Sequence, residues 1–364
     1  MAGIKENREF RFLTSPGNIT FAEVYVQKGS RLEFSRINNS LIFTAAIFRL
    51  KYHALVNINH GEIDSSWAWV ESEGKLVLDY TGHPAEVGPG AGNTKNMIGS
   101  GAGHGGEGGV YQAGQLGGEP YGSIYRPVHF GSGGGNGQGK GGSGGGMLHW
   151  RIGQEIELDG LVTLRGRSGS GTNAGGGSGG SILMETTNFT GYGEINVMGG
   201  DGAGPSGSGG SGGRISAHVR FRHKYAGVFK AYGGGGKIYA AAGTVYVEET
   251  ARGPQYADLK YDKSVNKTYV TATHKYMQVD NEDRKTDMSS MLLESEHLFY
   301  ELDELFLTRH ANLQVRHPPG SPNVTVIIHR FLGDGTGRFH VRVNQTIYVE
   351  VVESETNETT APCS

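Results

Sequence analysis

Short apolar segments bracketed by glycine return at a nearly constant interval in the middle of the chain. The segments 160–166, 193–199 and 227–233 begin about 33 residues apart, and each alternates apolar with polar side chains. The pattern Gly-Ser-Gly-Gly-x-Ile recurs at the same interval from Gly177 and Gly210. A flexible glycine-serine linker has no such register. The sequence therefore predicts ordered short strands separated by glycine-rich loops.

Glycine dominates this region without making the chain fibrous or disordered. Of the 364 residues 63 are glycine, and most of these lie between Gly82 and Gly213. A collagen helix is excluded because glycine shows no strict third-residue period and there are only 11 prolines. Hydrophobic residues make up 36% of the chain, with 17 Tyr, 14 Phe and 3 Trp, which is enough for a packed core.

The flanking segments carry a repeat of their own. Residues 21–34 match residues 302–315, and both alternate apolar with polar side chains around a small residue. The apolar skeleton recurs at 48–58 and more loosely at 156–164. Short strands repeating every ~20–25 residues are typical of stacked β coils. The predicted fold is all-β, a right-handed parallel β-helix or closely related β-solenoid with glycine-rich loops.

The composition divides the chain into five segments. Whether 82–146 is ordered stays open at this point, because glycine is densest there and the register is faintest. We expect N-terminal β coils over 1–81, the glycine-rich repeat over 82–250, a polar charged insertion over 251–298, C-terminal β coils over 299–353 and a polar tail over 354–364.

Seven sequons for N-glycosylation indicate a secreted chain. No secretory signal precedes them, which we interpret as a sign that these residues belong to a longer precursor. Cys363 is the only cysteine of the chain, so we expect it to be either a free thiol or cross-linked to another molecule. The predicted acceptors are Asn18, Asn38, Asn188, Asn266, Asn323, Asn344 and Asn357.

Charge and hydropathy exclude several partners. The formal net charge is -3, without a basic stripe or an acidic block, so we expect neither nucleic-acid binding nor the polyacidic kind of mineral binding. No stretch is apolar enough for a membrane-spanning helix. The expected partners are other matrix macromolecules or like chains, and mineral contact has no support from charge.

Glycine-rich sequences produce false nucleotide and calcium motifs. Residues 101–106 satisfy G-x-G-x-x-G without a preceding strand or following helix, and 134–140 continue with glycine where a P-loop needs Ser or Thr. Asp201 and Asp334 stand singly beside glycines, whereas calcium-binding β-rolls need tandem repeats. The acidic cluster 280–287 lacks the glycine of an EF-hand loop. The sequence predicts no metal site and no cofactor.

Catalysis also has no clear constellation. The groups available are Asp159, Glu194, Asp201 and His218, each of which also fits a surface position at a strand edge. Histidines at 104, 129 and 149 are too widely spaced to suggest zinc. We therefore predict no catalytic residues and no enzymatic activity.

The order of motifs resembles one protein family. Gly88-Pro-Gly-Ala-Gly, then Gly101-Ala-Gly-His-Gly-Gly, then Phe130-Gly-Ser-Gly-Gly-Gly, then the two blocks 175–187 and 209–219 are similar to the glycine-rich secreted or cell-surface repeat proteins of plants and animals. The resemblance covers about 76–247 and extends to glycine-rich proteins of shell and other organic matrices. It implies an extracellular, repeat-built, non-catalytic chain and assigns no functional residue.

These observations predict a structural glycoprotein of an extracellular organic matrix, with a biomineral such as shell as one setting. Exposed sheet edges would favour assembly with like chains. Two alternatives remain open. One is a cell-surface adhesion or ligand-binding ectodomain, and the other is a polysaccharide-active β-helix enzyme.

Overall fold

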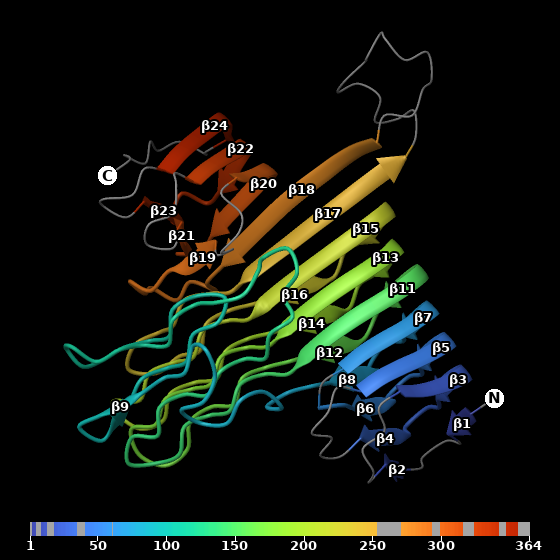
Figure 1. Ribbon diagram of the computed structural model, residues 1–364, viewed down its shortest axis with the longest axis horizontal. Coiled ribbons are helices and arrows are strands. Elements are labelled where there is room, and N and C mark those ends of the chain that lie inside the picture. The colour runs from blue at the N-terminus through green and yellow to red at the C-terminus, as the bar shows by residue number, and fades with distance from the viewer. Residues whose placement is uncertain are drawn as a thin grey trace.

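The computed structural model describes residues 2–4, 9–12, 18–34, 41–59, 61–252, 271–292, 299–315, 324–341 and 347–355. Within these ranges the chain forms strands, turns and loops, and no residue is helical. Buried and less buried residues alternate along most strands, as the period-two sequence pattern predicts. Most of the glycine-rich segments contain no strand and lie together where β11, β13 and β15 begin (Figure 1).

The largest element is a twelve-stranded sheet, hereafter the long sheet, in the order β1-β3-β5-β7-β11-β13-β15-β17-β18-β20-β22-β24. Its strands are parallel except where β17 meets β18, which pair antiparallel. The strands span Ala2–Ile4, Asn18–Val26, Leu41–Leu50, Gly61–Val70, Met147–Leu158, Ser181–Gly191, Arg214–Tyr225, Thr244–Arg252, Thr271–Asp280, Phe299–Thr308, Val324–Gly333 and Ile347–Glu355.

Shorter strands form the remaining sheets. A seven-stranded sheet pairs β16-β14-β12-β8-β6-β4-β2, whose bounds are Val228–Lys230, Glu194–Asn196, Leu161–Thr163, Lys75–Val77, Leu55–Asn57, Arg31–Phe34 and Glu9–Phe12. The C-terminal sheet pairs β19, β21 and β23, which span Ser290–Leu292, Asn312–Val315 and Arg338–Val341. A fourth, two-stranded sheet pairs β9 and β10, at Thr94–Lys95 and Ile98–Gly99.

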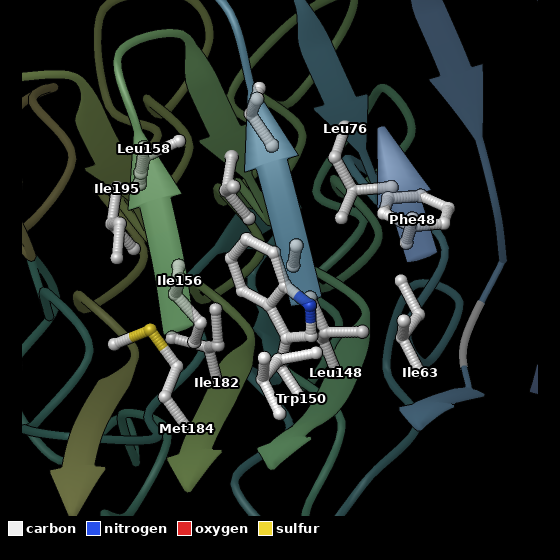
Figure 2. Close-up of a cluster of buried hydrophobic side chains, with 14 of the residues drawn as sticks. Phe48, Ile63, Leu76, Leu148, Trp150, Ile156, Leu158, Ile182, Met184 and Ile195 are labelled. Atoms are coloured by element: carbon white, nitrogen blue, oxygen red, sulfur yellow. The ribbon is translucent and has the colours of Figure 1, made fainter. Parts of the chain in front are cut away.

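The main core lies between the long sheet and the seven-stranded sheet. Parallel register places Ile63, Trp150, Met184 and Ala217 in one row across neighbouring strands. All four are buried, and the bulk of Trp150 is matched by the small Ala217 two strands away. Figure 2 shows Trp150 packed among aliphatic side chains from both sheets, including Leu76, Leu148, Ile182 and Ile195.

A second core lies under the C-terminal part of the chain. It joins the last strands of the long sheet to the C-terminal sheet, and Tyr246, Met277 and Leu305 are among its buried members. Both copies of the flanking sequence repeat fold alike, because 21–34 gives the end of β3, a turn and β4, whereas 302–315 gives β20, a turn and β21. The charged run 280–287 follows β18 directly.

The predicted right-handed parallel β-helix or β-solenoid is wrong. The strands lie in large, separate sheets, the long sheet is mixed because β17 and β18 are antiparallel, and the sheets do not form a closed helix of uniform coils. The sequence pattern contains information only on the alternation within strands and on the interval between them. The path of the chain between strands cannot be predicted from it, and here the glycine-rich segments leave the sheets and pack against one another.

Truncation of the central tryptophan tests this core. Replacing Trp150 with Ala leaves a cavity between the sheets, so we expect the free energy of unfolding to fall by about 3–5 kcal/mol. Denaturant unfolding measures the change. Phe221→Ala is the control, because Phe221 is 53% exposed and its loss should change stability by no more than about 0.5 kcal/mol. Equal effects of the two variants would contradict the packing described.

Candidate functional site

The glycine-rich segments form one hydrogen-bonded body, which we call the glycine bundle and define as residues 82–146, 164–180, 197–213 and 231–243. Its central tract is 175–180, which contains no strand. The backbone N–H groups of this tract point in three directions in turn. Gly175, Gly176 and Gly177 donate to the carbonyls of Gly135, Ser208 and Arg167, and the next three residues donate to Ser132, Ser211 and Leu164.

This order shows a period of three. Every third residue of the tract bonds to the same neighbouring segment again, at a residue three positions from the previous acceptor. An extended chain with three residues per turn has no internal hydrogen bonds, as in the polyproline II conformation, so all of its backbone groups face outward. The order of hydrogen bonds along the glycine tract fits such a three-residue repeat, and it joins the tract to more segments than the two that a β-strand contacts.

The carbonyl groups of the tract complete its surroundings. Gly175, Gly176 and Gly177 accept hydrogen bonds from the N–H groups of Gly142, Ala102 and Gly200. The tract is therefore bounded by six segments, which contain residues 132–135, 164–167, 208–211, 142–145, 102–104 and 200. Both the donors and the acceptors of a buried backbone are satisfied without a sheet.

The same geometry recurs one repeat later. Gly209 and Gly212 donate to Ile238 and Ala241, while Gly210 and Gly213 donate to Gly200 and Val197. The segment 82–146, whose order the sequence left open, belongs to the same network, because 131 and 134 donate to 145 and 142.

At several glycines of the bundle, the close approach of other backbone segments leaves no room for a side chain. A Cβ atom on Gly176 would lie 1.9 Å from the carbonyl oxygen of Gly200, and one on Gly179 would lie 1.8 Å from that of Val197. On Gly101 the distance to the Gly209 oxygen would be 1.6 Å. These are contacts with backbone atoms of other segments, so glycine is required here by close approach.

A buried polar cluster joins the bundle to the sheets. His104 lies within the bundle, and its Nδ1–H donates to the Gly179 carbonyl at 2.7 Å while Nε2 accepts from the Ser181 hydroxyl at 3.2 Å. Its ring stacks on Tyr121 with centroids 4.5 Å apart. Burial, followed by the positive charge of Arg214, lowers the pKa of His104 to about 3, so the ring is neutral.

Arg214 begins β15 and is fully buried. Its Nε–H donates to the Tyr121 carbonyl at 2.9 Å, and Nη1 donates to the Thr244 hydroxyl at 3.0 Å and to the Met291 carbonyl at 3.2 Å. The guanidinium therefore links the bundle, β17 and β19. Sequence analysis missed this residue, although Arg214 occupies the place that Ser181 holds in the preceding repeat.

The carboxylates weighed for catalysis do not converge. Asp159 accepts a hydrogen bond from the Tyr192 N–H at 2.9 Å, and Asp201 accepts from the Gly235 N–H at 2.6 Å. Glu194 pairs with Lys230 at 2.7 Å. Each carboxylate therefore stabilises a turn or a neighbouring strand.

The histidines also serve separate contacts. His218 lies 3.5 Å from Glu248 on the outer face of the long sheet, and its pKa is raised by Glu248 and by the Tyr125 carbonyl against the effect of burial. His149 pairs with Glu185 at 2.7 Å, and His129 packs edge-on against Tyr121. Among the described residues no three metal-ligating side chains meet.

The nucleotide-like and calcium-like motifs serve the bundle or its neighbours. Residues 101–106 and 134–140 contribute backbone hydrogen bonds to neighbouring tracts, and Lys140 bridges to Ser170 through its main chain. Asp280 pairs with Arg309, and Asp334 accepts hydrogen bonds from the turn around Thr336.

Two of the seven predicted N-glycosylation sites, Asn18 and Asn188, lie within the described residues. Asn18 is exposed at the start of β3, and Asn188 is half-buried on β13. Asn38, Asn266, Asn323, Asn344 and Asn357 lie outside the described residues, as does Cys363.

Comparison with protein-family models, with characterised proteins and with solved structures gives no match. Across the part of the chain that the structure describes, no helix has the length and apolar character needed to cross a membrane.

A single methyl group tests the close packing of the bundle. Gly176→Ala places a Cβ against a backbone oxygen that cannot turn aside, so we expect a loss of about 3 kcal/mol or more in the free energy of unfolding. Gly153→Ala is the matched control, since the nearest atom to its Cβ would be 3.8 Å away. Denaturant unfolding of both variants gives the comparison, and a tolerated Gly176→Ala would contradict the bundle.

Acid should weaken the cluster at His104. The unfolded chain binds a proton near the ordinary pKa of 6.5, whereas folded His104 does so only near 3. The contribution of neutral His104 to stability is therefore fully present above about pH 6.5, and it falls by about 1.4 kcal/mol per pH unit between that value and the folded pKa of about 3. Burial lowers the pKa of His83 and His129 as well, which steepens the loss.

The measurement is the free energy of unfolding between about pH 7.5 and pH 4.5. His104→Gln should flatten the slope by about one proton. His53→Asn is the control, because His53 is exposed and adopts a left-handed backbone that Asn tolerates. A slope unchanged by His104→Gln would refute the assignment.

Proposed function

We propose that this chain is a non-catalytic structural glycoprotein of an extracellular organic matrix, in which the glycine bundle acts as a rigid framework. The observation that carries the proposal is the central tract 175–180, which is bonded to six neighbouring segments and has no space for a Cβ atom at glycines such as Gly176 and Gly179. In such a body a large part of the sequence serves only to hold the backbone in a fixed arrangement. It leaves little of the glycine-rich sequence to form an adaptable active site.

The distribution of polar groups supports the same role. The outer face of the long sheet carries the row Asp64, Arg151, Glu185, His218 and Glu248, in which the sign alternates from strand to strand once His218 is protonated. Arg151 approaches Asp64 at 3.4 Å, and neighbouring members are likewise tied to one another or to adjacent side chains. These charges stabilise the stack of strands and are not arranged around a cleft.

Incorporation into matrix tests the proposal. Mass spectrometry of isolated extracellular matrix should recover peptides from 193–214, and these should be depleted from the cell lysate. Expressed in the same cells, Gly153→Ala should enter the matrix as the original chain does, whereas Gly176→Ala should not. Peptides confined to the lysate would refute an extracellular role. Equal incorporation of both variants would show that the bundle is not needed for it.

A ligand-binding ectodomain is the second candidate, favoured by one feature of the outer face. Trp67 and Trp69 stack with ring centroids 5.7 Å apart, and the Arg49 guanidinium lies 5.5 Å from the Trp69 ring. Half-buried aromatic rings on an open sheet face are typical of recognition surfaces. Loss of cell or ligand attachment in Trp67→Ala/Trp69→Ala, with matrix incorporation unchanged, would favour this second function.

A further inference from the structure

A pocket of about 440 Å³ lies where the glycine bundle meets the C-terminal sheet. The bundle contributes Lys237 and Tyr239, the loop after β18 contributes Lys285 and Asp287, and the C-terminal sheet with its preceding turn contributes Arg338 and His310. These three parts of the chain are far apart in sequence. Its volume lies in the range of small-ligand sites.

The lining of this pocket carries an excess of positive charge. Lys237, Lys285 and Arg338 are all exposed, and within the described ranges none of them forms an ion pair. Asp287 is the one carboxylate among the lining residues. The surplus contrasts with the formal net charge of -3 for the whole chain. Cations that share a concave surface raise the local concentration of anions.

Two arginines close to the pocket in sequence do form ion pairs with carboxylates. Arg309 binds Asp280 through Nε at 2.8 Å, and Arg284 pairs with Glu282 at 2.9 Å. Both flank the pocket in sequence without lining it. Carboxylates are thus available in the same loop, and among the described residues the three cations that line the pocket are not paired with them.

The pocket walls are held in place by hydrogen bonds. The Thr286 hydroxyl donates to the Tyr239 carbonyl at 2.6 Å, which ties the loop to the bundle. Asn312 Nδ2 donates to the Thr286 carbonyl at 2.6 Å and ties the same loop to β21. The His310 N–H donates to the Thr336 hydroxyl at 2.8 Å. The cationic side chains therefore project from a preformed frame, which lowers the entropic cost of binding.

We propose that this pocket binds the acidic group of an anionic glycan, either a sulfate or a carboxylate. Lys285 and Arg338 supply charge-assisted hydrogen bonds to the oxyanion. Tyr239 also lines the pocket and is 42% exposed, so aromatic surface is available beside the charge for the face of a sugar ring. Nucleic acid is disfavoured because the cations gather in one pocket and form no stripe.

Binding of defined oligosaccharides tests the proposal. Isothermal titration of the full chain at low salt should show binding of a sulfated or a uronic-acid oligosaccharide and none of the neutral sugar of equal length. Lys285→Gln/Arg338→Gln should raise the Kd about tenfold or more. Lys285→Arg/Arg338→Lys keeps the charge and should retain most of the affinity. Comparing the two acidic sugars identifies sulfate or carboxylate as the preferred group.

The control removes the same charge elsewhere. Lys75 and Arg220 are exposed and outside the pocket, so Lys75→Gln/Arg220→Gln should change the Kd less than about twofold. Thermal unfolding checks that the variants remain folded. No binding of either acidic sugar, equal weakening by both double variants, or tighter binding of a single-stranded RNA of equal charge would each overturn the proposal. The inference does not depend on the matrix function.

Discussion

Backbone hydrogen bonds between glycine tracts hold the centre of this molecule together. Along 175–180 each N–H is paired, in directions that repeat every third residue. At its glycines that arrangement requires backbones to approach closer than a Cβ allows, since a methyl on Gly176 would lie 1.9 Å from the Gly200 oxygen. Ordering glycine costs more chain entropy than ordering any other residue. The cost is offset because each tract bonds to many others at once.

Bundle and sheets constrain each other. Each central strand of the long sheet is preceded by a glycine tract, so the spacing of strands such as β13 and β15 fixes where tracts such as 175–180 and 209–213 can lie. Buried Arg214 sits at that junction and bonds to the bundle, β17 and β19 together. His104 must stay neutral in the same place. Acid sensitivity therefore follows from how the two parts are joined.

Groups that could bind a partner are those that the glycine bundle leaves exposed. Interior glycines present only backbone, and the carboxylates first considered for catalysis, such as Glu194 and Asp201, are engaged in local contacts. At the border of the bundle, Lys237, Lys285 and Arg338 line one pocket. Ligand sites commonly form where separate parts of a fold meet.

The strands and their interval could be predicted from the sequence, because alternation and glycine position are local properties of Val162, Ile195 and their neighbours. The regular recurrence of the glycine segments was visible there too. Three features became visible only in the folded chain: the sheets do not close into a β-helix, β17 and β18 run antiparallel, and 82–146 belongs to the bundle. Glycine has no side chain to show which segment it will meet. Its partners are set by backbone groups that are identical at every position, so they emerge only when the tracts are packed together.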